Sequence, residues 1–252
     1  MPELKLKIGC TQEELKQAQS LHYEVFGLEM NTRGIPHDRN DLDSDEFDAC
    51  CEHIIVTDTE NHQVVGTYRM LLDGVAKDHH GFYSEGKFNI DNIKKLPGYK
   101  LEVGRSCVHK DYRHNQVLNL LWQGIVRYAM DHQVRYIFGC ANIMTANPQA
   151  ISAYFNMFKH LGLYQDLGAS PVHPREAIVP SEEISVANPK KLYNNLPTLF
   201  KGYMHVGLKV CSLPVEGDFG TAVFFVLLDI AHMNPSYKRR FFGHYLEETV
   251  KK

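Results

Sequence analysis

The sequence has no excess of basic residues, no long apolar run and no pair of cysteines at C-x-x-C spacing. The net charge of its 252 residues is −3 at pH 7, whereas proteins that bind nucleic acids usually carry a clear basic excess. Its apolar stretches fall short of the ~20 residues that a membrane-spanning helix needs. These absences argue against a nucleic-acid partner and against a transmembrane protein.

The six cysteines are scattered, and the 14 histidines contain no cluster with zinc-like spacing. We also find no secretory signal pattern. We therefore expect free thiols in the reducing cytoplasm, no metal and no tightly bound cofactor.

Helical and strand patterns alternate along the chain, which predicts an α/β fold with mixed strand directions. Cap residues and apolar spacing predict helices at 11–30, 116–131, 147–162 and 196–210. Alternating or continuous apolar runs predict strands at 53–58, 63–73, 101–109, 134–143 and 221–230. We expect a single domain over residues 1–252, with a mixed loop at 74–99, an irregular insertion at about 165–197 and a basic, aromatic tail.

The stretch LEVGRSCVHKDYR, residues 101–113, carries a carboxylate and a guanidinium three residues apart, Glu102 and Arg105. Residues at this spacing point to opposite faces of a regular strand. They share a face only if the strand is irregular, and Gly104 is a natural place for a bulge. The alternative is an ordinary strand in which one of the two forms a buried ion pair.

An acidic segment, DLDSDEFDACCE, covers residues 41–52 and has carboxylates at the spacing of a calcium loop. The sixth position of such a loop should be glycine but is Glu46, and a strand follows where a helix is expected. Two interpretations remain: a solvated acidic loop, or acidic groups that bind a cationic acceptor.

These patterns together resemble a known family, the ornithine-lipid N-acyltransferases, within the GNAT-fold N-acyl amino acid synthases. The resemblance covers about residues 18–242 and rests on EFD, HIIVTD, VVGTYRMLL, LEVGRSCV, NLLWQGI, YIFGCANI, LFKGYMHVGLKVC and DFGTAVFFVLLDI, in that order. A more distant similarity is to acyl-homoserine-lactone synthases, through Glu46–Asp48, Gly66 with Arg69, and Glu102 with Arg105.

The resemblance implies a GNAT-like mixed, mostly antiparallel sheet flanked by helices, with central strands at 101–109 and 134–143 that splay apart around pantetheine. It implies transfer of a long-chain (3-hydroxy)acyl group from acyl carrier protein, or from coenzyme A, to the amine of an amino acid such as ornithine. The turn RHNQVL lacks the glycines that let a backbone approach a pyrophosphate, which favours the carrier protein as donor.

The resemblance also implies roles for individual residues. Glu102 is the expected base, and Arg105 orients it or binds the acceptor's carboxylate. Arg69 is a comparable anchor, whereas Asp45 and Asp48 are expected to hold a cationic side chain of the acceptor. The acyl donor is expected to bind at Val108, Arg113, His114, Asn115 and Gln116, where a strand end and a helix N-terminus meet basic side chains.

Several alternatives stay open. Cys107 as a nucleophile is a lesser option, because a thiol in mid-strand is commonly structural. A short-chain GNAT acetyltransferase using acetyl-CoA and a non-catalytic acyl-carrier or lipid-binding protein fit the same fold. The tail around 235–246 either rests on the anionic inner face of the membrane or forms a solvated terminal helix.

Overall fold

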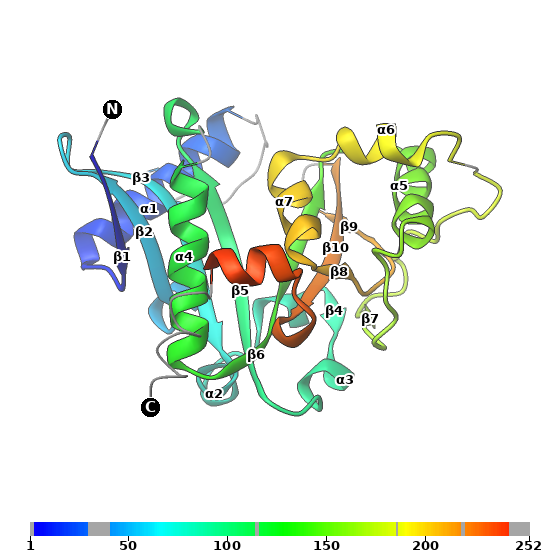
Figure 1. Ribbon diagram of the computed structural model, residues 1–252, viewed down its shortest axis with the longest axis horizontal. Helices are drawn as coiled ribbons and strands as arrows, with labels where there is room; N and C mark the ends of the chain where they lie inside the picture. The colour runs from blue at the N-terminus through cyan, green and yellow to red at the C-terminus, as the bar shows by residue number, and fades with distance from the viewer. Residues whose placement is uncertain (1–2, 30–40, 114–115, 185, 218–219, 242–252) are drawn as a thin grey trace. The chain divides into compact units, whose positions relative to one another are not determined.

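The computed structural model describes residues 3–29, 41–113, 116–184, 186–217 and 220–241 (Figure 1). The chain forms two compact units. The first unit contains residues 1–81, 101–134 and 241–252, and the second contains 82–100 and 135–240. The single domain expected over 1–252 stays a prediction.

The sheet of the first unit is antiparallel throughout. Its strands lie in the order β1 (Leu4–Ile8), β2 (Glu52–Asp58), β3 (Gln63–Leu72) and β5 (Tyr99–Val108). Its helical elements are α1 (Gln12–His22), the π-helix η1 (Tyr23–Glu29), the 3₁₀ turn η2 (Glu46–Ala49), α2 (Asp73–Asp78), the 3₁₀ turn η4 (Lys110–Tyr112) and α4 (Gln116–Asp131).

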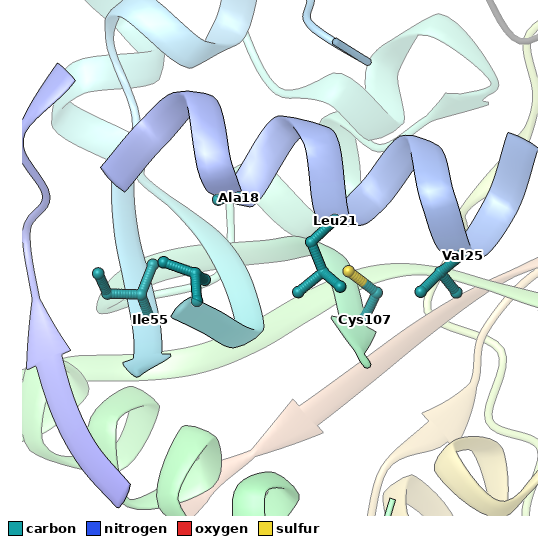
Figure 2. Close-up of a cluster of buried hydrophobic side chains, with 6 residues drawn as sticks. Ala18, Leu21, Val25, Ile55 and Cys107 are labelled. Atoms are coloured by element: carbon teal, nitrogen blue, oxygen red, sulfur yellow. The ribbon is translucent and has the colours of Figure 1, made fainter. Parts of the chain in front are cut away.

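The two long helices of this unit cover opposite faces of its sheet. Ile55 and Cys107 belong to the apolar cluster beneath α1, which Figure 2 shows with Leu21 pointing down onto them. The neighbouring Ile54 lies under α4, where a Cβ on Gly124 would come within 2.9 Å of it. Successive strand residues alternate between faces, so the continuous apolar run of β2 serves both helices.

Local sequence signals set the ends of these helices. The side chain of Thr11 accepts from the backbone of Glu14, whose carboxylate accepts from the backbone of Thr11, forming the predicted capping box. The helix predicted over 11–30 divides at His22, after which the chain continues as a π-helix to Glu29. The helix predicted at 116–131 has those bounds.

The sheet of the second unit is centred on β10 (Thr221–Asp229), which pairs antiparallel with three strands. These are β6 (Val134–Ile143), β8 (Lys209–Val210) and β9 (Val215–Gly217), while β4 (Phe88–Asn89) and β7 (Ser170–Pro171) form a separate pair. The helices and 3₁₀ turns are η3 (Tyr83–Gly86), α3 (Asp91–Lys94), α5 (Pro148–His160), α6 (Pro189–Asn194), α7 (Thr198–Val206) and η6 (Ile230–His232).

The structure differs from the sequence-based assignment at two places in this unit. The helix predicted to reach residue 210 ends at Val206, because Gly207 adopts φ 114° and its N–H turns back to Tyr203 and Met204. Residues 209–210 are then free to pair as β8. The stretch 74–99, predicted as mixed loop, contains short helical elements and β4, which have too few residues for a periodic pattern.

The mostly antiparallel α/β fold with flanking helices is confirmed. Among its described residues, the insertion at 165–197 contains two short elements, β7 and α6. Splaying of the strands 101–109 and 134–143 stays a prediction. Within the described ranges, no helix combines the length and the apolar character that crossing a bilayer requires. The tail predicted around 235–246 is described as far as residue 241, and its expected membrane contact stays a prediction.

Candidate active site

A bulge interrupts β5 where the sequence predicted an irregularity. Arg69 pairs with Gly104 and Thr67 pairs with Cys107, so the single residue Tyr68 lies opposite both Arg105 and Ser106. Arg105 has φ 51°, in the left-handed region that side chains rarely adopt. The predicted bulge is therefore confirmed, with its strained residue one position after Gly104.

The bulge changes which side chains share a face. Glu102 pairs with Leu71 and Gly104 pairs with Arg69, so Glu102 and Arg69 are diagonal neighbours on one face of the sheet. Without the extra residue, Arg105 would point to the other face. In the structure its guanidinium reaches the same carboxylate that Arg69 binds, that of Asp45.

Asp45 is the centre of a buried ion-pair network. Its Oδ1 lies 2.5 Å from Arg69 Nη1, and its Oδ2 lies 2.8 Å from Arg105 Nη2. Asp48 binds Arg69 Nη1 at 2.7 Å and also accepts from the Gln19 amide at 2.8 Å. The Arg69 side chain is only 6% exposed, so these carboxylates supply the counter-charge that a buried guanidinium needs.

The network continues to α1 through a third carboxylate. Asp43 Oδ1 lies 2.5 Å from Arg105 Nη1, and Asp43 Oδ2 lies 2.6 Å from His22 Nδ1. His22 and Asp43 were missed in the sequence analysis, since 20 residues separate them and no local pattern couples a helix end to an acidic loop. The acidic segment itself was noticed, and its solvated-loop interpretation is wrong at Asp43, which is buried.

The mutual contacts fix the charges of the network. Burial alone would raise the pKa of Asp43 and of Asp45, but hydrogen bonds from His22, Arg69 and Arg105 outweigh it and hold both pKa values below their ordinary range. Burial opposes the charge of Arg69 and Arg105 as well, yet the carboxylates raise the pKa of each guanidinium. The network therefore contains three carboxylates for two guanidinium groups.

Glu102 is buried close to this network, with 5% of its surface exposed. The Glu102 carboxylate and the Arg69 guanidinium both act on the thiol of Cys51. Burial raises the pKa of Cys51 to about 12, the positive charge of Arg69 opposes that rise, and the negative charge of Glu102 adds to it. Glu102, Arg69 and Cys51 thus lie in one neighbourhood, on the sheet face that also carries Cys107.

Cys107 itself is buried in the apolar cluster under α1, and burial raises the pKa of its thiol far above the usual value. A thiol of this kind stays protonated and is a poor nucleophile. The structure thus supports the structural role of Cys107 over the nucleophilic one.

The residues expected to bind the acyl donor are only partly described. Arg113 donates through both Nη atoms to Glu29, each at 2.6 Å, and through Nε to the carbonyl of Val108 at 3.0 Å. Gln116 is the exposed first residue of α4. His114 and Asn115 lie outside the described residues, and the donor-binding role of all five stays a prediction.

Comparisons with known proteins identify the fold class and the family of the chain. A family model described as an acetyltransferase (GNAT) domain matches residues 21–123. FeeM, an N-acyl amino acid synthase from uncultured soil microbes, has the same fold, with a TM-score of 0.51 and 11% identity over 92% of this chain and 93% of that one. The family model and the shared fold define the fold class of the chain, which is that of the GNAT proteins.

Sequence similarity identifies the family within this class. The L-ornithine Nα-acyltransferase of Rhizobium meliloti is 34% identical over 247 residues, which cover 93% of this chain and 82% of that protein. The L-ornithine Nα-acyltransferase of Brucella abortus is 32% identical over 248 residues, covering 93% and 87%. The chain belongs to the family of L-ornithine Nα-acyltransferases, as its sequence motifs predicted.

Proposed function

We propose that this enzyme transfers a long-chain (3-hydroxy)acyl group from acyl carrier protein to the α-amine of ornithine. The observation that carries the proposal is the placement of Glu102, a buried carboxylate that shares a sheet face with Arg69 while the bulge turns Arg105 to the same side. The family membership supports the same acceptor, since the named relatives are ornithine acyltransferases.

The reaction requires a base because the α-amine of an amino acid is protonated near neutral pH. In our proposal, Glu102 takes one proton from the ammonium, directly or through water. The freed nitrogen lone pair attacks the thioester carbonyl, a C–N bond forms, and the C–S bond breaks. The released sulfur leaves as the thiol of the carrier's pantetheine after a proton reaches it, and the product is an N-acyl amino acid.

The arginines are proposed to act on the acceptor's carboxylate. A guanidinium binds a carboxylate through two parallel hydrogen bonds, which orients the amine at the other end of the amino acid. Arg105 is the better exposed candidate, with 20% of its side chain accessible against 6% for Arg69. In this proposal Asp45 holds both guanidinium groups in place.

The roles of Asp45 and Asp48 toward the acceptor's cationic side chain stay predictions of the sequence. Both carboxylates bind arginines of the protein itself, so such a cation has to share them. The surplus of carboxylates over guanidinium groups supports sharing, because ornithine carries one more positive than negative charge.

The experiment is an assay of the pure protein with palmitoyl-carrier protein, palmitoyl-CoA or acetyl-CoA as donor and a panel of amino acids as acceptors. We expect mass spectrometry to detect N-palmitoyl-ornithine formed from the carrier-protein donor. N-acetylated products alone would favour the short-chain acetyltransferase. No product with any donor, together with tight binding of the acylated carrier protein, would favour the non-catalytic alternative.

The role of Glu102 is tested by the variant Glu102→Gln, which keeps the size of the side chain and removes its basicity. We expect kcat to fall by about 10²-fold or more. The matched control is Glu60→Gln, which makes the same change at an exposed turn and should leave kcat unchanged. A folded Glu102→Gln enzyme with the wild-type rate would overturn the assignment of the base.

A further inference from the structure

His22, the last residue of α1, is held on one side by a buried carboxylate. Its Nδ1 lies 2.6 Å from Asp43 Oδ2, and its ring stacks on Phe26 with the two centroids 4.4 Å apart. The other oxygen of Asp43 binds Arg105. The imidazole is therefore fixed in both position and ring plane, directly beside the guanidinium that the proposed mechanism uses.

The contacts of Asp43 determine which ring nitrogen carries the proton. Asp43 accepts from Arg105 and its pKa is held below the ordinary value, so it is an ionised carboxylate and can only accept. His22 Nδ1 must therefore be the donor in the 2.6 Å contact. In the neutral imidazole this leaves the lone pair on Nε2.

The Nε2 atom of His22 has no hydrogen-bond partner, neither a side chain nor a backbone group, among the described residues. The atom is also not fully buried. The side chain of His22 is 13% exposed. An unpaired nitrogen that is not fully buried can meet a ligand.

The surrounding charges keep this imidazole neutral. Burial lowers the pKa of His22, the hydrogen bond to Asp43 opposes that, and the positive charges of Arg105 and Arg69 lower it further. Asp43 precedes η2, Arg105 lies on β5 and Arg69 on β3, so these groups face His22 from three other segments. The ring is thus neutral near pH 7, and the lone pair of Nε2 is not occupied by a proton.

We propose that the Asp43–His22 pair is a second proton acceptor of the acyl-transfer site, with Nε2 taking a proton from the acceptor's nitrogen. This inference rests on the proposed function. The ammonium must lose one proton before it attacks and a second before the amide is formed. Glu102 takes the first in our scheme. His22 takes the second and passes it to the leaving sulfur or to solvent.

The test uses His22→Asn, whose amide nitrogen occupies the place of Nδ1 and can still donate to Asp43, while the basic Nε2 is lost. We expect kcat to fall at least tenfold, with KM for ornithine changed by less than about threefold. The acidic limb of the wild-type pH–rate profile should contain the ionisation of His22, and the variant should lack that ionisation. His160→Asn, at the exposed end of α5, is the matched control.

A second variant guards against loss of folding. The variant His22→Gly should regain activity when imidazole is added, because the free base can enter the space that the side chain leaves. Two results would overturn the proposal. One is a folded His22→Asn enzyme with the wild-type kcat and the wild-type acidic limb of the pH–rate profile. The other is a folded His22→Gly enzyme that imidazole does not rescue. A wild-type protein that acylates none of the acceptors would instead overturn the proposed function, so the two failures are distinguishable.

Discussion

Arg69 and Arg105 bind the two oxygens of one carboxylate, although they come from different strands and only Arg69 occupies a regular strand position. Arg69 Nη1 lies 2.5 Å from Asp45 Oδ1, and Arg105 Nη2 lies 2.8 Å from Asp45 Oδ2. Two like charges held this close need the shared anion between them. The bulge in β5 is what brings Arg105 within reach of it.

Removing the shared anion should destabilise the protein strongly. The variant Asp45→Asn keeps the shape of the side chain but leaves two partly buried guanidinium groups with less counter-charge. We expect the free energy of unfolding to fall by about 2–4 kcal/mol, measured by urea denaturation with a fluorescence readout. The control is Asp131→Asn, which breaks an exposed pair with Arg127 and should cost less than about 0.5 kcal/mol. Equal losses in the two variants would contradict the central place of Asp45.

The left-handed conformation of Arg105 gives a prediction that is independent of its charge. Arg105→Gly and Arg105→Ala both lose the guanidinium, but only glycine adopts φ 51° without strain. We expect Arg105→Gly to be the more stable of the two by about 1 kcal/mol. The same pair of substitutions at Arg127, inside α4, should give the opposite order, because glycine weakens a helix by about 1 kcal/mol relative to alanine. The same order at both positions would mean that Arg105 is not left-handed in solution.

The features that were predicted correctly from the sequence are those that short-range contacts determine. The capping box of Thr11 and Glu14 and the cap at Asn147 involve groups within three residues of one another, and both helix starts were placed correctly. The bulge was foreseen at Gly104, but the strained residue is Arg105. Its side chain forms ion pairs with Asp43 and Asp45, about 60 residues away in the chain, and no local pattern encodes such a partnership.

Only some residues of the site can be recognised from the sequence. Glu102 and Arg69 stood out because the family motifs contain them, and the pairing of β3 with β5 places them on one face. His22 follows an ordinary amphipathic pattern at the end of a helix. Its partner Asp43 lies in an acidic segment whose several carboxylates cannot be distinguished from the sequence alone. Only the folded chain distinguishes the one that the imidazole binds.

The neutral state of His22 makes stability depend on pH. The pKa of His22 in the folded protein lies below its ordinary value of 6.5, so between these two values the unfolded chain binds more protons than the folded one. The free energy of unfolding therefore rises with pH across this window, and it falls on acidification from about pH 7.5 to about pH 5.5, by at most about 1.4 kcal/mol per pH unit. His22→Asn should lose less stability over the same range, measured as urea midpoints at each pH. A variant that follows the wild-type curve would show that another group titrates.

The buried thiol of Cys107 gives the last prediction, which separates a structural cysteine from a nucleophile. Cys107→Ala should keep kcat within about twofold, because burial raises the pKa of the thiol and leaves almost no thiolate to attack the thioester. It should cost about 1 kcal/mol of stability, since the sulfur packs under α1 in the cluster of Figure 2. The measurements are the acyl-transfer rate and urea denaturation. Glu102→Gln is the comparison variant, because it should lose rate where Cys107→Ala keeps it. A loss of 10²-fold in kcat for a fully folded Cys107→Ala enzyme, together with an acylated Cys107 in the wild type by mass spectrometry, would replace direct attack by a covalent route.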